Sequence, residues 1–240
     1  LDIKNLANFY RKNGYRDFRV IDNSMEYLDD GIYLFFDLHE GEINYYKDFI
    51  FTGNNKFSDK ELLNALEIKK GDTFNKEKFD LSVFQLNSKY FDVGYYFLEN
   101  KYNLQPVSNN QLDVYFNIIE NSETRVRKII ISGNDKTYEN VIRRELMVFP
   151  GDTFSRKKLL ESYRDIFMLN FFNNVTPNVI PVDDKEIDII FDVEEKESGQ
   201  ANFSMGYSGV SGFTGGGGFQ FPNFLGRGQL LSLSYNRGLS

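Results

Sequence analysis

The apolar and polar positions of this chain follow two different periods, and each period occupies its own stretches. Residues 112–118 and residues 187–193 place an apolar side chain at every second position, which is the period of a strand with one buried face. Apolar residues within 79–90 and 159–166 recur every three or four positions, which predicts amphipathic helices. Because helices and strands alternate over short distances, the pattern predicts an α+β fold.

Residues 42–121 contain one complete set of elements, which we call a module. Ser58 followed by Glu61 has the capping-box spacing that begins a helix, and Gly71 ends it. The predicted elements are, in order, a strand at 42–52, a helix from Ser58, a helix from Asn75, and strands at 95–104 and 112–118. The order β-α-α-β-β predicts two helices on one face of a three-stranded sheet.

Residues 122–197 repeat this order as a second complete module, and residues 1–41 supply only its second half. In the second complete module, Thr137 and Ser155 are expected to cap the two helices. Its predicted strands lie at 126–132, 175–180 and 187–193, and those of residues 1–41 lie at 15–21 and 32–38 after a helix that ends near Tyr10.

The repeat is also visible letter by letter at an offset of 80 residues. Gly53-Asn54 recurs as Gly133-Asn134, and residues 71–74 (Gly-Asp-Thr-Phe) recur as residues 151–154. Three glycine pairs share this offset, namely Gly14/Gly94, Gly53/Gly133 and Gly71/Gly151. A glycine that recurs at matched turns predicts a backbone demand such as a positive φ. Arrays of small similar domains usually hold or guide another chain.

The last segment, residues 198–240, has a different composition and is called the tail. It contains eleven of the 19 glycines, no acidic residue, and only Arg227 and Arg237 as basic residues. Large apolar residues alternate with small or polar ones, the pattern of transmembrane β-barrel strands; a glycine-rich soluble hairpin is the alternative. Three strands cannot close a barrel, so we expect further strands to follow.

Charge and cysteine content narrow the function. Residues 1–198 carry 26 basic and 35 acidic side chains, a balance of −9, without the basic stripe expected for nucleic-acid binding. The absence of cysteine excludes disulfides, thiolate metal sites and thiol catalysis. No signal peptide and no apolar run long enough for a transmembrane helix are visible.

Catalytic chemistry has few candidate residues. The single histidine, His39, is expected on the exposed side of a strand, which disfavours a histidine-based catalytic triad or metal site. The acidic pairs Asp29-Asp30 and Asp183-Asp184 are interpreted as solvated hairpin loops rather than acid–base pairs. We therefore predict a protein that is not an enzyme and needs no cofactor or metal.

These residues carry a family resemblance. Modules of order β-α-α-β-β with a Gly-Asn turn after the first strand and a Gly-Asp-Thr-Phe link between the helices resemble polypeptide-transport-associated (POTRA) domains. Residues 126–145 are similar to the last such domain of the bacterial outer-membrane β-barrel assembly factors, and the tail is similar to the first barrel strands of that family. By this resemblance, residues 1–41 are the end of a third POTRA domain, 42–121 the fourth, 122–197 the fifth, and 198–240 the start of the barrel.

The resemblance implies a role in the bacterial outer membrane, with the POTRA domains in the periplasm. The implied partners are unfolded outer-membrane proteins, accessory assembly lipoproteins and outer-membrane lipid. The implied mechanism is strand addition, in which an incoming chain pairs with an open strand edge. The first barrel strand would offer one such edge through Asn202, Phe203, Met205 and Tyr207.

The resemblance also implies that the second strand of each module is a sheet edge. The strands predicted at 15–21 and 95–104 lack proline, whereas the strand at 175–180 contains Pro177 and is followed by Pro181, which remove hydrogen-bond donors. The candidate strand-pairing residues are Tyr15, Phe18, Val20, Tyr95, Phe97 and Glu99, and a proline at Phe97 is expected to weaken client crosslinking.

Two other functions fit parts of the sequence. A two-partner-type secretion pore shares the layout but would have two modules and a pore-plugging N-terminal helix. A soluble periplasmic peptide-binding adaptor would remain in the aqueous fraction without detergent. The short links at 120–123 and 194–199 predict limited hinge freedom between the modules.

Overall fold

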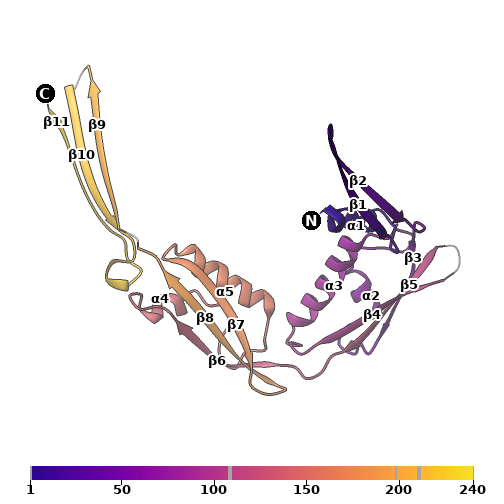
Figure 1. Ribbon diagram of the computed structural model, residues 1–240. Coiled ribbons are helices and arrows are strands. Elements are labelled where there is room, and N and C mark those ends of the chain that lie inside the picture. The colour runs from indigo at the N-terminus through magenta and orange to yellow at the C-terminus, as the bar shows by residue number, and fades with distance from the viewer. Residues whose placement is uncertain (1, 108–109, 198, 210–211, 240) are drawn as a thin grey trace. The chain divides into compact units, whose positions relative to one another are not determined.

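Each of the two complete modules is a three-stranded sheet with two helices on one face (Figure 1). The computed structural model describes residues 2–107, 110–197, 199–209 and 212–239. The chain divides into two compact units, Leu1–Ser122 and Glu123–Ser240, which are described separately.

The first complete module follows the predicted order. Its elements are β3 (Tyr45–Thr52), α2 (Asp59–Leu63), α3 (Lys76–Phe91), β4 (Glu99–Pro106) and β5 (Gln111–Ile119). The spatial order of its sheet is β3-β5-β4, with β3 parallel and β4 antiparallel to β5. The last strand in sequence is therefore the central one, and both β3 and β4 are sheet edges. The α+β fold predicted from the hydrophobic pattern is confirmed.

The core of this module lies between the sheet and the helices. The alternating residues of β5 face it and are almost fully buried, among them Phe116, whose ring stacks against Phe51 at 5.2 Å and Phe79 at 6.4 Å between ring centroids. From the helices, Leu62, Leu86 and other buried residues complete the same cluster. Burial of this continuous apolar layer is the main stabilising term.

The second complete module has the same topology. Its elements are β6 (Arg125–Ser132), α4 (Glu139–Arg143), α5 (Arg156–Met168), β7 (Phe172–Pro181) and β8 (Glu186–Glu195), with the sheet order β6-β8-β7. The central strand β8 buries Ile187, Ile189, Phe191 and Val193, which are the residues predicted to face inward.

Three of the four predicted helix caps are confirmed. Ser58 and Glu61 form a capping box, and the side chains of Asn75 and Ser155 accept the first hydrogen bonds of α3 and α5. The cap predicted at Thr137 is wrong, because the N-cap of α4 is the next residue, Tyr138, which makes no side-chain cap hydrogen bond. Thr137 is buried, and its N–H donates to the Glu195 carboxylate at 2.6 Å.

The paired glycines have nearly identical backbone angles. The φ values are 103° and 97° for Gly14 and Gly94, 79° and 80° for Gly53 and Gly133, and 89° and 90° for Gly71 and Gly151. The prediction that these positions require positive φ is therefore confirmed.

Residues before the first complete module form α1 (Asp2–Lys12) and a hairpin of β1 (Arg19–Leu28) and β2 (Gly31–His39). β1 begins four residues later than predicted. Because the N–H of Tyr15 bonds to the Tyr10 carbonyl and that of Phe18 to the Tyr15 carbonyl, this stretch is a turn. The far part of the hairpin leaves Met25, Tyr27 and other apolar side chains exposed.

The tail forms an antiparallel sheet in the order β11-β10-β9, as Figure 1 shows. Its elements are β9 (Gln200–Ser208), β10 (Gly212–Phe221), a short 3₁₀ turn η1 (Phe224–Gly226) and β11 (Leu231–Leu239). The three predicted strands are therefore present.

Candidate functional site

The outer edge of β4 is a candidate site for strand addition. Val107 N–H donates to the Gln111 carbonyl at 2.8 Å. Val107 and every second residue before it therefore direct their backbone N–H and C=O groups toward β5. Asn100, Tyr102 and Leu104 therefore direct their N–H and C=O groups away from the sheet. No strand in the described part of the chain pairs with this edge.

One backbone group of this edge already has a partner. The Arg16 guanidinium donates to the Leu104 carbonyl at 3.4 Å, which confirms that this carbonyl faces outward. The N–H groups of Asn100, Tyr102 and Leu104 remain on the open side as donors for an added strand, whereas Pro106 has no N–H to offer. The accessible edge is thus short and centred on Tyr102.

The corresponding edge of the second complete module is poor in donors. Val182 N–H donates to the Glu186 carbonyl at 2.9 Å, which places Val182 and every second residue before it in contact with β8. Pro177 and Pro181 therefore both occupy positions that face the open edge of β7. Only Val175 and Val179 keep an N–H there, so β7 is a weaker template than β4.

The candidate residues in the first complete module lie beside this edge rather than along it. β4 begins at Glu99, four residues later than predicted, so Tyr95 and Phe97 precede the strand. The physical reason is a pair of turns, in which Tyr95 N–H bonds to the Tyr90 carbonyl and Leu98 N–H to the Tyr95 carbonyl. Glu99 is on β4, but its backbone faces Ile119 of β5 by the same alternation.

The candidate residues before this module are also only partly on a strand. Tyr15 forms an isolated bridge with Ile43, and Phe18 is 1% exposed and stacks on Tyr10 at 4.0 Å between ring centroids. Phe18 is therefore a core residue. Val20 is the one candidate of the three that lies on β1.

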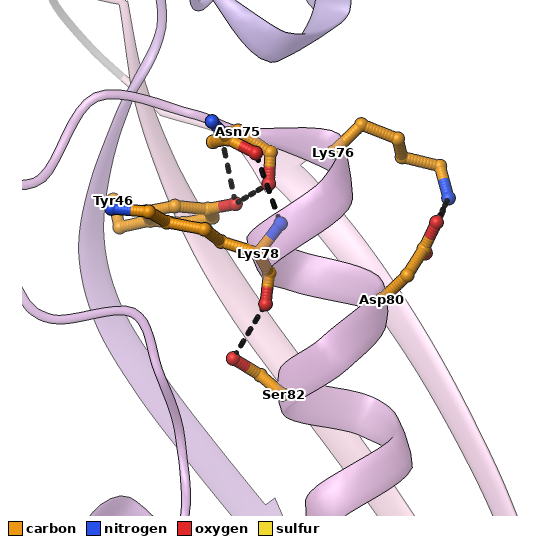
Figure 2. A network of polar contacts seen from close by, with 6 residues as sticks. All are labelled: Tyr46, Asn75, Lys76, Lys78, Asp80 and Ser82. Carbon is orange, nitrogen blue, oxygen red and sulfur yellow. Dashed lines mark hydrogen bonds and ion pairs between the residues drawn. The ribbon is translucent and has the colours of Figure 1, made fainter. Parts of the chain in front are cut away.

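Asn75 joins the first complete module to the residues before it. Its side-chain oxygen accepts from Lys78 N–H at 2.9 Å and caps α3, while its amide nitrogen donates to the Lys12 carbonyl at 2.8 Å. Figure 2 shows the helix start, where Tyr46 hydroxyl contacts the Asn75 backbone and Lys76 pairs with Asp80. The end of α1 is thus held directly by the cap of α3.

An ion pair and a glycine complete this joint. Lys12 Nζ lies 2.6 Å from the Glu77 carboxylate, and both side chains are exposed. A Cβ on Gly14 would lie 2.7 Å from Thr73 Cγ2 and 2.8 Å from Ile43 Cγ2. The backbone at Gly14 therefore rests against the module, with Asn44 N–H donating to its carbonyl at 3.0 Å.

Acidification is expected to loosen this joint. The hydrogen bond and charge of Lys12 hold the pKa of Glu77 below its ordinary value of 4.5. A carboxyl group whose pKa is lower in the folded state than in the unfolded state stabilises the fold when the pH is above the unfolded-state pKa. This stabilisation is lost as the pH falls through the folded-state pKa. Hydrogen exchange of the Asn44 amide, corrected for its intrinsic pH dependence, should accelerate by roughly two- to threefold below about pH 4.

Glu77→Gln is the control for this measurement, because it keeps the side-chain size and removes the titrating group. Its Asn44 amide should exchange at a corrected rate that changes little between about pH 6 and about pH 3.5. An acid step of the same size in Glu77→Gln would show that another group controls the joint.

The tail sheet has one apolar and one polar face. The register pairs Phe203 with Gly217 and Tyr235, and pairs Met205 with Gly215 and Arg237, so the apolar residues of all three strands share one side. Met205 is 93% and Phe203 82% exposed. Arg237 is the only charged side chain on that face in the described part of the sheet. A contiguous exposed apolar face marks an interaction surface.

A cavity beside β3 was not predicted from the sequence. Its volume is about 530 Å³, and it lies where the register of β3 shifts between Tyr46 and Phe49. Leu63 and Ile68 form part of its apolar lining, and Lys47 also lines it. The equivalent of Leu63 in the second complete module is Arg143, which donates to the Ile129 carbonyl at 3.0 Å.

The remaining titratable candidates lie where the sequence placed them. His39 is exposed at the end of β2, and Asp29-Asp30 form its hairpin turn with β1. Asp183 Oδ1 accepts from the N–H groups of Lys185 and Glu186, which closes the turn before β8. Within the described ranges no cluster of three or more potential metal ligands is present. None of the helices described is long and apolar enough to cross a membrane.

Comparison with known proteins matches both modules to one family. The family model described as "POTRA: Surface antigen variable number repeat" matches residues 44–121 and 124–196.

Curated relatives cover nearly the whole chain. A putative outer membrane protein assembly factor of Treponema pallidum (strain Nichols) is 30% identical over 96% of this chain and 29% of its own length. Outer membrane protein assembly factor BamA of Neorickettsia risticii (strain Illinois) is 28% identical over 94% of this chain and 31% of its own length. The chain thus spans about 30% of the length of these relatives.

Solved structures show the same arrangement of elements. The crystal structure of BamA from Haemophilus ducreyi lacking POTRA domains 1–3 is 26% identical, with a TM-score of 0.72 over 81% of this chain and 37% of that chain. The structure of POTRA domains 3–5 of Haemophilus influenzae BamA has a TM-score of 0.68 at 19% identity, over 81% of this chain and 79% of that chain, which shows the fold.

Proposed function

The chain belongs to the POTRA family, surface antigen variable number repeat, and from this premise we propose that it is part of an outer-membrane protein assembly factor. Relatives at 25–30% identity are described as assembly factors, which supports assembly over a secretion pore or a soluble adaptor. In this proposal the modules lie in the periplasm and the tail enters the outer membrane. The protein acts by holding and templating chains, without catalysis.

We propose the domain order third, fourth and fifth for residues 1–41, 42–121 and 122–197. The similarity to a structure that lacks POTRA domains 1–3 supports this order. The tail would then supply the first strands of a membrane barrel. Its alternating strands and its exposed apolar face support this assignment.

The proposed mechanism is strand addition at the β4 edge, and the observation that carries it is the outward direction of the Asn100 and Tyr102 N–H groups. Main-chain hydrogen bonds to an open edge do not depend on client sequence, which suits a protein with many outer-membrane clients. β9 offers a second open edge in the tail, where Phe203, Met205 and Tyr207 would meet lipid. Accessory lipoproteins remain proposed partners.

A proline in the middle of the β4 edge tests this mechanism. Tyr102→Pro removes one outward N–H, and we expect it to weaken binding of an extended peptide by roughly tenfold. The probe is a synthetic peptide with the sequence of residues 231–239, in which apolar residues alternate with small or polar ones except at Arg237. Binding is measured by titration of the backbone amide resonances of the full chain in detergent micelles.

Two control variants isolate the missing donor. Tyr102→Ala also loses the contact between this ring and Phe79 but keeps the N–H, so it should bind nearly as well as the unmodified chain. Val179→Pro alters the β7 edge, which already carries two prolines, and should change binding little. Equal binding by Tyr102→Pro and Tyr102→Ala would refute addition at this edge while leaving the family assignment intact.

A further inference from the structure

The loop between β10 and β11 rests on the loop between β6 and α4. Asn223 Nδ2 donates to Thr137 Oγ1 at 2.8 Å, and Tyr138 N–H donates to the Gly226 carbonyl at 2.9 Å. The residues in contact are more than 80 positions apart in sequence. We call residues 223–228 the clasp and residues 133–138 the socket.

The fit between clasp and socket depends on two glycines. Gly226 is buried with a φ of 72°, and a Cβ there would lie 1.9 Å from the Lys136 carbonyl oxygen. A Cβ on Gly228 would lie 2.9 Å from Val141 Cγ1. Since a Cβ never approaches a backbone oxygen so closely, no other residue fits at Gly226 without separating the two loops.

Both loops are shaped by their own hydrogen bonds. In the clasp, Asn223 Oδ1 accepts from Gly228 N–H at 2.7 Å, and Phe224 N–H donates to the Gln229 carbonyl at 2.7 Å. In the socket, the Glu195 carboxylate accepts from the N–H groups of Lys136 at 2.9 Å and Thr137 at 2.6 Å. The contact surfaces are therefore preorganised, which lowers the entropic cost of docking.

The repeat shows what is specific to this socket. In the first complete module the equivalent positions are Ser58 and Glu61, and Ser58 N–H donates to the Glu61 carboxylate at 3.0 Å within the module. In the second, these positions are Tyr138 and Val141, so the internal acceptor is missing. The Gly226 carbonyl of the clasp is the acceptor for the Tyr138 N–H instead. Val141 is shorter than the glutamate at the equivalent position, and Gly228 lies against it.

We propose that the socket is an interaction surface dedicated to residues 223–228 of this chain, and that the clasp makes the tail sheet and the second complete module move as one body. The two segments fall within the same compact unit. This inference goes beyond the proposed assembly role and does not depend on it.

Two variants open the clasp by different routes. Gly226→Ala introduces a Cβ that collides with the Lys136 carbonyl. The double substitution Tyr138→Ser with Val141→Glu transfers the capping box of the first complete module, so that position 138 bonds within its own module and the introduced carboxylate fills the space of Gly228. Gly209→Ala, in the turn between β9 and β10 where a Cβ meets nothing within 4 Å, is the matched control.

The measurement uses the full chain in detergent micelles. Because the chain has no cysteine, spin labels at Asn178→Cys and Ser234→Cys, both exposed positions, report the distance between module and tail sheet by pulsed electron paramagnetic resonance. We expect a narrow distance distribution for the unmodified chain and for Gly209→Ala. Both clasp variants should broaden it, and Tyr138 amide exchange in Gly226→Ala should accelerate by roughly tenfold.

Amides of β8 control for folding, because they should stay protected in every variant. If the β8 amides of Gly226→Ala lose protection, the distance distribution of the double substitution alone tests the proposal. A distribution that stays narrow in the double substitution, with β8 protected, would overturn the proposal. So would a broad distribution in the unmodified chain.

Discussion

Replacing Gly53 with alanine is expected to destabilise the first complete module by about 2–5 kcal/mol, the sum of two costs. Positive φ costs an L-residue about 1–2 kcal/mol, and the new Cβ would lie 2.0 Å from the Ile118 carbonyl oxygen. Relieving that collision must displace β3 from β5, an overpacking cost of about 1–3 kcal/mol. Hydrogen exchange of β5 amides in the full chain measures the local free energy of opening.

Gly71 provides the matched control for this substitution. Its φ is 89°, but a Cβ there meets nothing within 4 Å, so Gly71→Ala carries only the conformational cost of about 1–2 kcal/mol. The amides of β8, in the other compact unit, should be unchanged in both variants. Equal losses for Gly53→Ala and Gly71→Ala would show that the close approach to Ile118 contributes nothing.

Replacing Phe116 with alanine is expected to cost about 3–5 kcal/mol, because a large cavity opens at the centre of a core that cannot collapse. Phe116 is 1% exposed, and its ring stacks against those of Phe51 and Phe79. The expected result is loss of protection across β3, β4 and β5 in the full chain. Retention of these amides with a free-energy change below about 1.5 kcal/mol would contradict the packing argument.

The second complete module separates the aromatic contribution from simple burial. Phe191 is the equivalent of Phe116 and is fully buried, but the positions equivalent to Phe51 and Phe79 are Ile131 and Leu159. Phe116→Leu should therefore cost more than Phe191→Leu by about 0.5–1.5 kcal/mol, the range for an aromatic pair beyond burial. The comparison uses the same exchange experiment on β5 and β8.

The element order of both modules could be predicted from the sequence because strong local signals agree there. Alternation in 112–118 and 187–193, the capping box at Ser58 and the paired glycines each have one local physical cause. The exact offset of 80 residues then allowed one module to support the interpretation of the other. The family resemblance rested on the same residues and is confirmed by the match to residues 44–121 and 124–196.

The errors occurred where a backbone hydrogen bond overrides the preference of the side chain. Thr137 has the side chain of a good cap, but the Glu195 carboxylate binds its N–H and the N-cap of the helix is Tyr138. Tyr95 has high strand propensity, but its N–H is held by the Tyr90 carbonyl and the chain turns before β4. The Glu195 carboxylate is 58 positions from Thr137 and leaves no local pattern, whereas the Tyr90 carbonyl is a local partner that strand propensity alone does not reveal.

The candidate edge could be predicted only in part. The lack of proline in the second strand of the first complete module and the two prolines of β7 were visible in the sequence, and both strands are sheet edges. Which backbone groups face outward depends on the pairing register, and a shift of one residue would exchange Tyr102 for Lys101. The register became known only from the pairing of Val107 with Gln111.

Because Asn75 contacts both α1 and α3, bending between these two helices depends on the first turn of α3 staying formed. Its oxygen holds the first turn of α3 while its nitrogen holds the last carbonyl of α1, so bending at this point strains the helix start itself. The resistance of this joint to bending should therefore fall with temperature in the same way as the population of the first turn of α3. Warming should therefore weaken this joint at a lower temperature than it unfolds the core of the first complete module.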